Sequence, residues 1–209
     1  MDDQQRDLAA RLQDSDITAR IVRNIADIER DYHFANGPLS DRLMGEMIQT
    51  IVKAATDHWL VVEKEPSAFI TTPDWKVTGV GNGDMWLELS ELCGDEVEHS
   101  WIAVAVRGGN TQLCLELMFR RGLAEAAEAL IRTDKVVAAL LKLGFVRDQD
   151  VPRLFLPIHI PAEALAIGLE QNDLDEALAP VGRAVGLATA ALAELNKLLE
   201  QVRPSSRRK

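Results

Sequence analysis

The chain has 209 residues, of which 47% are hydrophobic and 27% are charged, a balance typical of globular proteins and not of disordered ones. The 33 acidic residues against 23 basic ones give a formal net charge of −10, which disfavours sequence-independent binding to nucleic acid. No apolar run approaches the roughly 18 residues of a membrane span, residues 1–30 lack the apolar core of a signal peptide, and two cysteines are too few for a disulfide scaffold. We therefore expect a cytoplasmic protein that binds neither membranes nor nucleic acid.

The N-terminal residues follow a helical pattern. Isoleucines recur at steps of four and three at positions 17, 21, 25 and 28, which places them on one side of a helix. The turn residues at 36–38 precede Ser40, a typical N-cap, and a second apolar stripe runs from residue 43 to residue 55. The pattern predicts an N-terminal helical segment over residues 1–57.

The middle of the chain changes to a period of two, which indicates strands. Residues 85–92 and 112–119 alternate most regularly, and shorter extended segments are expected near residues 59–62 and 68–72. Asn82-Gly83 is a typical hairpin turn, so we expect residues 75–80 to pair with 85–92. In the same way, the turn at 108–110 suggests that residues 101–106 pair with 112–119.

A helical pattern returns over residues 123–143 and ends at Gly144, while Thr133-Asp134 could start a second, separate helix. Residues 145–146 and 154–160 then resemble a strand pair around an Asp-rich turn. The prolines at 157 and 161 place the second strand at a sheet edge, because proline cannot donate a ladder hydrogen bond.

The C-terminal region carries the most regular apolar pattern. Its members, hereafter the seam, are spaced alternately four and three apart: Leu174, Leu178, Val181, Val185, Ala188, Leu192, Leu195, Leu199 and Val202. Such a helix either lies on the sheet or packs on a helical partner. A straight helix over this range would be about 43 Å long, whereas five strands side by side span about 24 Å, so something else must cover part of the seam. A kink at Pro180 would reduce that excess.

This argument favours a homodimer formed through the C-terminal helix or through an exposed sheet edge. The candidate partner-binding residues are Leu174, Val181, Val185, Leu192, Leu195 and Leu199.

Together these patterns predict an α+β fold: an N-terminal helical pair, a largely antiparallel sheet of four to six strands, and a long C-terminal helix packed on the sheet. The expected division is a helical segment at 1–57, an α+β domain at 58–202, and a disordered basic tail at 203–209.

Two acidic residues suggest one possible metal site. Pro73-Asp74, followed by Glu88-Leu89-Ser90 on the next strand, resembles the layout of PD-(D/E)XK nucleases, in which an Asp and a Glu on adjacent strands hold Mg²⁺. The resemblance implies Asp74 and Glu88 as metal ligands. The chain departs from the family at Ser90, which stands where the nucleases carry a lysine that helps activate water, so nuclease activity is not expected.

A broader resemblance covers residues 100–200. The strand at 113–119, a helix containing Lys135-Val136-Val137 and ending at Gly144, a strand pair and a closing amphipathic helix resemble the YbjN and type III secretion chaperone-like proteins, and also modules that accompany such nucleases. The chaperone-like resemblance implies a small, acidic, dimeric α+β protein that binds other proteins and has no catalytic residues.

The function expected from the sequence is therefore a non-enzymatic protein-binding or assembly module with no cofactor and an unidentified protein partner. The alternatives are a degenerate nuclease-like or nuclease-accessory protein, and a module that encloses a small apolar ligand beneath Trp86 or Trp101.

Overall fold

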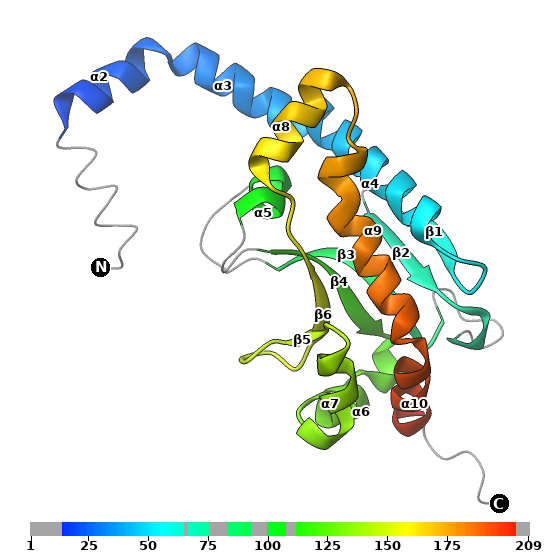
Figure 1. Ribbon diagram of the computed structural model, residues 1–209. Coiled ribbons are helices and arrows are strands. Elements are labelled where there is room, and N and C mark those ends of the chain that lie inside the picture. The colour runs from blue at the N-terminus through cyan, green and yellow to red at the C-terminus, as the bar shows by residue number, and fades with distance from the viewer. Residues whose placement is uncertain (1–13, 65–66, 76–82, 93–99, 108–111, 204–209) are drawn as a thin grey trace, which may run out of the picture. The chain divides into compact units, whose positions relative to one another are not determined.

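The computed structural model describes residues 14–64, 67–75, 83–92, 100–107 and 112–203 (Figure 1). It divides into two compact units, Met1–Asp41 and Arg42–Lys209. The boundary therefore lies at Asp41 and not at residue 57. The reason is that helix α4 (Ser40–Ala54) belongs almost entirely to the second unit, where its apolar side is buried: Leu43, Met47 and Ile51 are at most 1% exposed.

The described part of the first unit, which begins at residue 14, is helical, as the isoleucine spacing predicted. Helix α2 (Ser15–Arg23) starts at Asp14, whose carboxylate accepts hydrogen bonds from two backbone N–H groups of the first turn. Helix α3 (Ile25–Phe34) follows after a break at Asn24, and a short π-helical turn η1 (Ala35–Leu39) leads to α4.

Ser40 does not cap α4 in the expected way. Its own backbone is helical, and its hydroxyl donates a hydrogen bond to the carbonyl oxygen of Ala35. An N-cap residue needs extended backbone so that its oxygen can accept from the first turn. The prediction was wrong because η1 continues the helical path with a kink at Gly37, so α4 has no free N-terminus there.

The second unit is built on a six-stranded sheet in which all pairs are antiparallel, in the order β1-β2-β3-β4-β6-β5. This confirms the predicted α+β fold. The strands are β1 (Leu60–Lys64), β2 (Ser67–Thr71), β3 (Met85–Leu92), β4 (Gln112–Phe119), β5 (Val146–Arg147) and β6 (Leu154–Ile158). Pro157 is tolerated because β5 pairs only with the first two residues of β6 and leaves the rest of that edge free.

The expected hairpin between residues 75–80 and β3 lies almost entirely outside the described residues. Trp75 lies in a 3₁₀ turn, η2 (Pro73–Trp75), and residues 76–82 lie outside the described residues. A strand has only two hydrogen-bonding edges, and β3 pairs through them with β2 and β4. Gly83 has a positive φ of 97°, so the positive-φ signal of the Asn-Gly pair is confirmed for the glycine.

Residues 101–106 were also assigned wrongly, since they form a helix, α5 (Trp101–Arg107), instead of a strand. The Ser100 hydroxyl accepts a hydrogen bond from the backbone N–H of Ala103, which caps the helix. Val104 and Ala105 are neighbours in the sequence and are both 1% exposed. A strand with one buried face cannot bury two consecutive side chains on that face, so the apparent alternation was misleading.

The remaining helices follow β4 and β6 in the chain (Figure 1). They are α6 (Arg121–Ile131), α7 (Asp134–Lys142), α8 (Ala162–Gln171), α9 (Asp175–Ala190) and α10 (Leu192–Val202). The break between α6 and α7 falls at Thr133, as the sequence allowed, and α7 is followed by Gly144 with a φ of 98°. Helix α8 was not predicted.

The long C-terminal helix is two helices, α9 and α10, that meet at Ala191 with a bend of 61°. Pro180 lies inside α9 and is buried, and the chain bends at Ala191 instead. Helix α9 lies against β6, and α10 packs against α6 and α7 (Figure 1). Among the described residues no single helix is long and apolar enough to cross a membrane, and α9 and α10 meet that criterion only when joined across the bend.

A buried ion cluster fixes the end of α10 to the sheet. The Asp84 side chain is 1% exposed and accepts from two guanidinium groups, Arg120 at the end of β4 and Arg203, whose Nε lies 2.8 Å from Oδ2 of Asp84. Arg203 also donates through Nη2 to the backbone oxygen of Asp74 at 3.1 Å. Arg203 is therefore part of the folded domain, which corrects the expectation that the free tail begins at residue 203. Residues 204–209 lie outside the described residues.

Candidate functional site

One face of the sheet is buried beneath helices and the other is partly exposed. On β3, Met85, Leu87 and Leu89 are at most 5% exposed, and the residues between them are intermediate. On β4 the alternation is matched only at the centre of the pair, where the intermediate Glu116 and Met118 lie opposite the intermediate Glu88 and Trp86. We define the open face as five side chains that share the partly exposed side of these strands: Trp86, Glu88, Ser90, Glu116 and Met118.

Glu116 lies at the centre of the open face. Glu88 is directly opposite it on β3, and Arg153 approaches from the β5–β6 turn, with its Nη1 4.0 Å from Oε1 of Glu116. The Ser90 side chain hydrogen-bonds to the carboxylate. Burial raises the pKa of Glu116, and Glu88 and Asp148 raise it further, against the opposing effects of Arg153 and Ser90. The cluster therefore holds two opposed carboxylates that a single arginine does not fully compensate.

Trp86, the aromatic residue of the open face, is held in place by a hydrogen bond and by a contact with another ring. The indole Nε1 of Trp86 donates to Oε2 of Glu88 at 2.9 Å, and the Trp86 ring packs on Phe69 with 6.3 Å between the ring centroids. Trp86 thus presents a fixed, partly exposed ring beside a carboxylate. Trp101, the other tryptophan considered as cover for an apolar ligand, is the first residue of α5 and is also partly exposed.

Cys114 lies on the same side of β4 as Glu116 but is completely buried. Burial raises the pKa of its thiol far above the ordinary value, and the nearby Glu116 adds to the effect. The thiol is therefore protonated at neutral pH, and Cys114 is a packed apolar residue, in agreement with the sequence-based interpretation.

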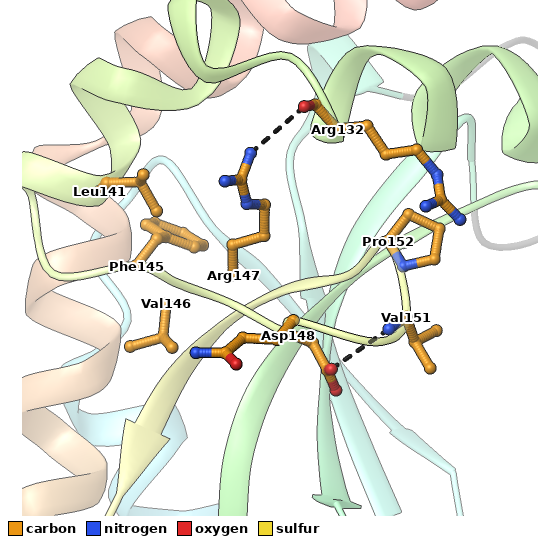
Figure 2. Close-up of a pocket in the computed structure, with 9 residues that line it drawn as sticks. Arg132, Leu141, Phe145, Val146, Arg147, Asp148, Val151 and Pro152 are labelled. Carbon is orange, nitrogen blue, oxygen red and sulfur yellow. Dashed lines mark hydrogen bonds between the residues drawn. The ribbon is translucent and has the colours of Figure 1, made fainter.

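A pocket of about 690 Å³ adjoins this cluster at the β5–β6 turn (Figure 2). It is lined by Arg132, Leu141, Phe145, Val146, Arg147, Asp148, Gln149, Val151 and Pro152. Arg147 Nη1 donates to the carbonyl oxygens of Ile131 and Arg132, at the C-terminal end of α6. The carboxylate of Asp148 accepts from the backbone N–H groups of Asp150 and Val151.

The pocket and the open face are joined through one ion pair. Asp148 lines the pocket, and its Oδ2 lies 3.2 Å from Nε of Arg153, the residue that also faces Glu116. Arg147 compensates the carbonyl end of a helix, and Arg153 compensates Asp148. Arg147 and Asp148, two charged residues of the pocket, thus already have partners within the protein. The open face is therefore the stronger candidate for contact with another molecule.

The opposite signs of the pKa shifts at Glu116 and Asp148 lead to a prediction. Because the pKa of Glu116 is raised, the stability it contributes is present below the ordinary carboxyl pKa and is lost as the pH rises through the raised pKa. The neutral substitution Glu116→Gln avoids that loss, so its free energy of unfolding should exceed that of the unmodified protein at pH 7 and equal it near pH 4. Urea unfolding across this range measures the difference.

Asp148→Asn is the matched control and should behave in the opposite way. Hydrogen bonds from the backbone of Asp150 and Val151, together with Arg153, lower the pKa of Asp148. The stability from this group is present above its ordinary pKa and is lost as the pH falls through the lowered one. Asp148→Asn should therefore destabilise the protein at pH 7, and this destabilisation should diminish as the pH falls through the lowered pKa of Asp148. If both substitutions destabilise the protein at pH 7, the contact of Arg153 with Glu116 outweighs burial.

The structure does not bring the two candidate metal ligands together. The backbone N–H of Asp84 donates to the carbonyl of Trp75 at 2.7 Å, so the exposed Asp74 lies level with the start of β3. Glu88 is four residues farther along that strand, a separation of about 13 Å. No group of three His, Cys, Asp or Glu side chains that could hold a metal ion occurs in the part of the chain that the structure describes.

The candidate partner-binding residues of the seam lie in the interior. Leu174, Val181, Val185, Leu195 and Leu199 are at most 6% exposed, and Leu192 is intermediate. The bend at Ala191 lets this chain cover the seam with its own sheet and helices, which the calculation for a straight helix did not allow. Apart from the partly exposed Leu192, the seam therefore offers a partner little surface, and the argument that led from an uncovered seam to a homodimer no longer applies.

Sequence reasoning missed the residues that organise the open face. Glu116 could have been found, because it is an acidic residue within an otherwise apolar alternating strand. Arg153 could not, because its position depends on how the β5–β6 turn folds back onto β4.

The chain was compared with protein-family models, with curated proteins and with solved structures, and none of them matches it.

Proposed function

We propose that the protein is a non-enzymatic protein-binding module that works as a homodimer and docks a protein partner on the open face. The observation that carries the proposal is the row of partly exposed side chains across β3 and β4, in which a fixed tryptophan and a methionine flank two opposed carboxylates. Aromatic residues and methionine are enriched at protein interfaces, so this combination favours a protein partner.

The charges on the open face indicate the chemistry of that partner. Glu88 and Glu116 on the open face and Asp148 in the adjoining pocket are acidic, and Arg153 contacts Glu116 and Asp148. Two carboxylates in opposed positions on neighbouring strands repel each other, and a positive group placed between them would relieve that repulsion. The expected partner therefore presents an apolar segment together with lysine or arginine side chains, and its approach should be accelerated by the acidic surface.

Photo-crosslinking in the cells that produce the protein tests the proposal. A photoreactive phenylalanine derivative at Met118 reports on the open face, and the same group at Leu187, which is 42% exposed on α9, is the matched control. We expect a discrete protein adduct from position 118 that position 187 does not give. A second substitution, Glu88→Arg, should abolish that adduct because it reverses the charge offered to the partner. Equal adducts at both positions, or an adduct that persists in Glu88→Arg, would contradict docking on this face.

A further inference from the structure

The N-terminal arm, defined as α2 and α3 (Ser15–Phe34), has no buried side chain. Six large apolar residues of the arm are between 44% and 66% exposed: Ile21, Val22, Ile25, Ile28, Tyr32 and Phe34. Helices of nine and ten residues are marginal in water by themselves, because most helical stability in proteins comes from packing an apolar side against something else. The arm therefore needs a surface to cover its apolar stripe.

The apolar residues of the arm are arranged nearly symmetrically about its centre. The break between the two helices lies at Asn24. Ile21 and Ile28 lie equally far from the midpoint between residues 24 and 25, and so do Ile17 and Tyr32. Two copies of such a stripe placed antiparallel would therefore bring Ile21 of one copy against Ile28 of the other, and Ile17 against Tyr32, which is the self-complementary pattern of a two-fold interface. Val22, Ile25 and Phe34 have no apolar counterpart in this register.

The charges of the arm favour the same orientation. Asp27 and Arg30 form an ion pair within α3. Within the described residues, the other basic side chains of α2, Arg20 and Arg23, have no ion-pair partner, and neither do Glu29 and Asp31 of α3. Helix α2 also carries Asp16 in its first turn, so its net charge is positive only by the excess of two arginines over one aspartate, whereas the net charge of α3 is negative. Antiparallel pairing places α2 of one copy beside α3 of the other, so that opposite charges meet, whereas parallel pairing would place like charges together.

We infer that a second copy of this chain covers the arm, with the two arms antiparallel and Asn24 near the two-fold axis. The inference rests on the proposed function only in taking the protein to be a homodimer, and it assigns the dimer interface to the arm in place of the buried seam. Docking of a partner on the open face uses different residues and does not depend on it.

Light scattering coupled to gel filtration at micromolar concentration tests the apolar part of the interface. We expect the unmodified full chain to have about twice the 23.1 kDa mass of one chain, and Ile21→Ser combined with Ile28→Ser to have the mass of one chain. Ile167→Ser combined with Leu187→Ser is the matched control, because both residues are 42% exposed and lie in the second unit. This control should remain dimeric, and urea unfolding checks that the second unit of every variant is folded.

Charge reversal tests the orientation. Arg20→Glu with Arg23→Glu makes both helices of the arm acidic, and Glu29→Arg with Asp31→Arg makes both basic. Each double variant alone should dimerise at least tenfold more weakly than the unmodified protein. An equimolar mixture should recover the affinity to within about threefold, since antiparallel pairing then joins acidic with basic helices throughout.

The outcomes separate this inference from the proposed function. A dimer that survives both the serine and the charge-reversal substitutions would overturn the arm as the interface and leave the homodimer standing. Variants that weaken the dimer singly but do not recover in the mixture would overturn the antiparallel arrangement. An unmodified protein with the mass of one chain at every concentration would overturn both the arm interface and the proposed homodimer.

Discussion

Replacing Asp84 by asparagine should lower the free energy of unfolding by about 3 kcal/mol, since removal of one member of a buried ion cluster leaves the others without compensation. Asp84 is 1% exposed and accepts from Arg120 and Arg203, which come from the ends of β4 and α10. The substitution keeps the shape of the side chain and the backbone hydrogen bond from Asp84 to Trp75, but it removes the negative charge between two guanidinium groups. We expect an effect at the lower end of the range for buried pairs because both arginines are more than a third exposed and can regain water.

Urea unfolding at pH 7 measures this effect, and Asp74→Asn is the matched control. Asp74 is exposed and contributes only its backbone oxygen to Arg203, so its amide variant should unfold within about 0.5 kcal/mol of the unmodified protein. Arg203→Gln should lose part of the stability that Asp84→Asn loses, and the two effects should not add, because the residues share one interaction. If Asp84→Asn and Asp74→Asn have equal stability, the cluster does not hold the C-terminal helix in place.

Leu195→Ala should destabilise the protein by about 2–5 kcal/mol without changing its oligomeric state. Leu195 is completely buried in α10, on the seam that the sequence suggested as a dimer contact. Truncating a fully buried leucine removes its transfer free energy and leaves a cavity, whereas truncating an interface leucine would mainly weaken association. The two roles are therefore separated by measuring both quantities on the same variant.

Leu192→Ala provides the comparison from the same seam. Leu192 is only partly buried at the start of α10, so its truncation should cost about 1 kcal/mol. Chemical unfolding gives the stability, and light scattering gives the mass. A Leu195→Ala protein with unchanged stability but half the mass of the unmodified protein would return the dimer interface to the seam and contradict its assignment to the core.

The open face and the arm differ in how far the sequence determines them. The N-terminal arm consists of twenty consecutive residues, 15–34. The helical spacing of its apolar residues, their placement about Asn24 and the signs of its charges can therefore be predicted from the sequence. What the sequence could not show is that these side chains stay exposed, because burial depends on the rest of the chain.

The sequence by itself determined the parts of the fold that depend on local periodicity. The alternation in β3 and β4 predicted two strands with their correct bounds, although not that they pair with each other. Gly144 correctly ended a helix because a residue without Cβ readily adopts its positive φ. A local pattern does not predict the secondary structure where a helix and a strand can both show it. Residues 101–106 alternate like a strand, but β3 and β4 pair directly with each other along their whole length, and these residues, which lie between them in the sequence, form helix α5.

Only the tertiary structure decided which distant residues meet. Asp84 and Arg203 are 119 residues apart, and nothing in either neighbourhood indicates that they pair. The bend at Ala191 likewise has no breaking residue to announce it, and it converts a seam that seemed too long for the sheet into one that the chain itself buries. Such contacts are set by the path of the whole chain, because a buried charge is stable only where folding brings its partners to it.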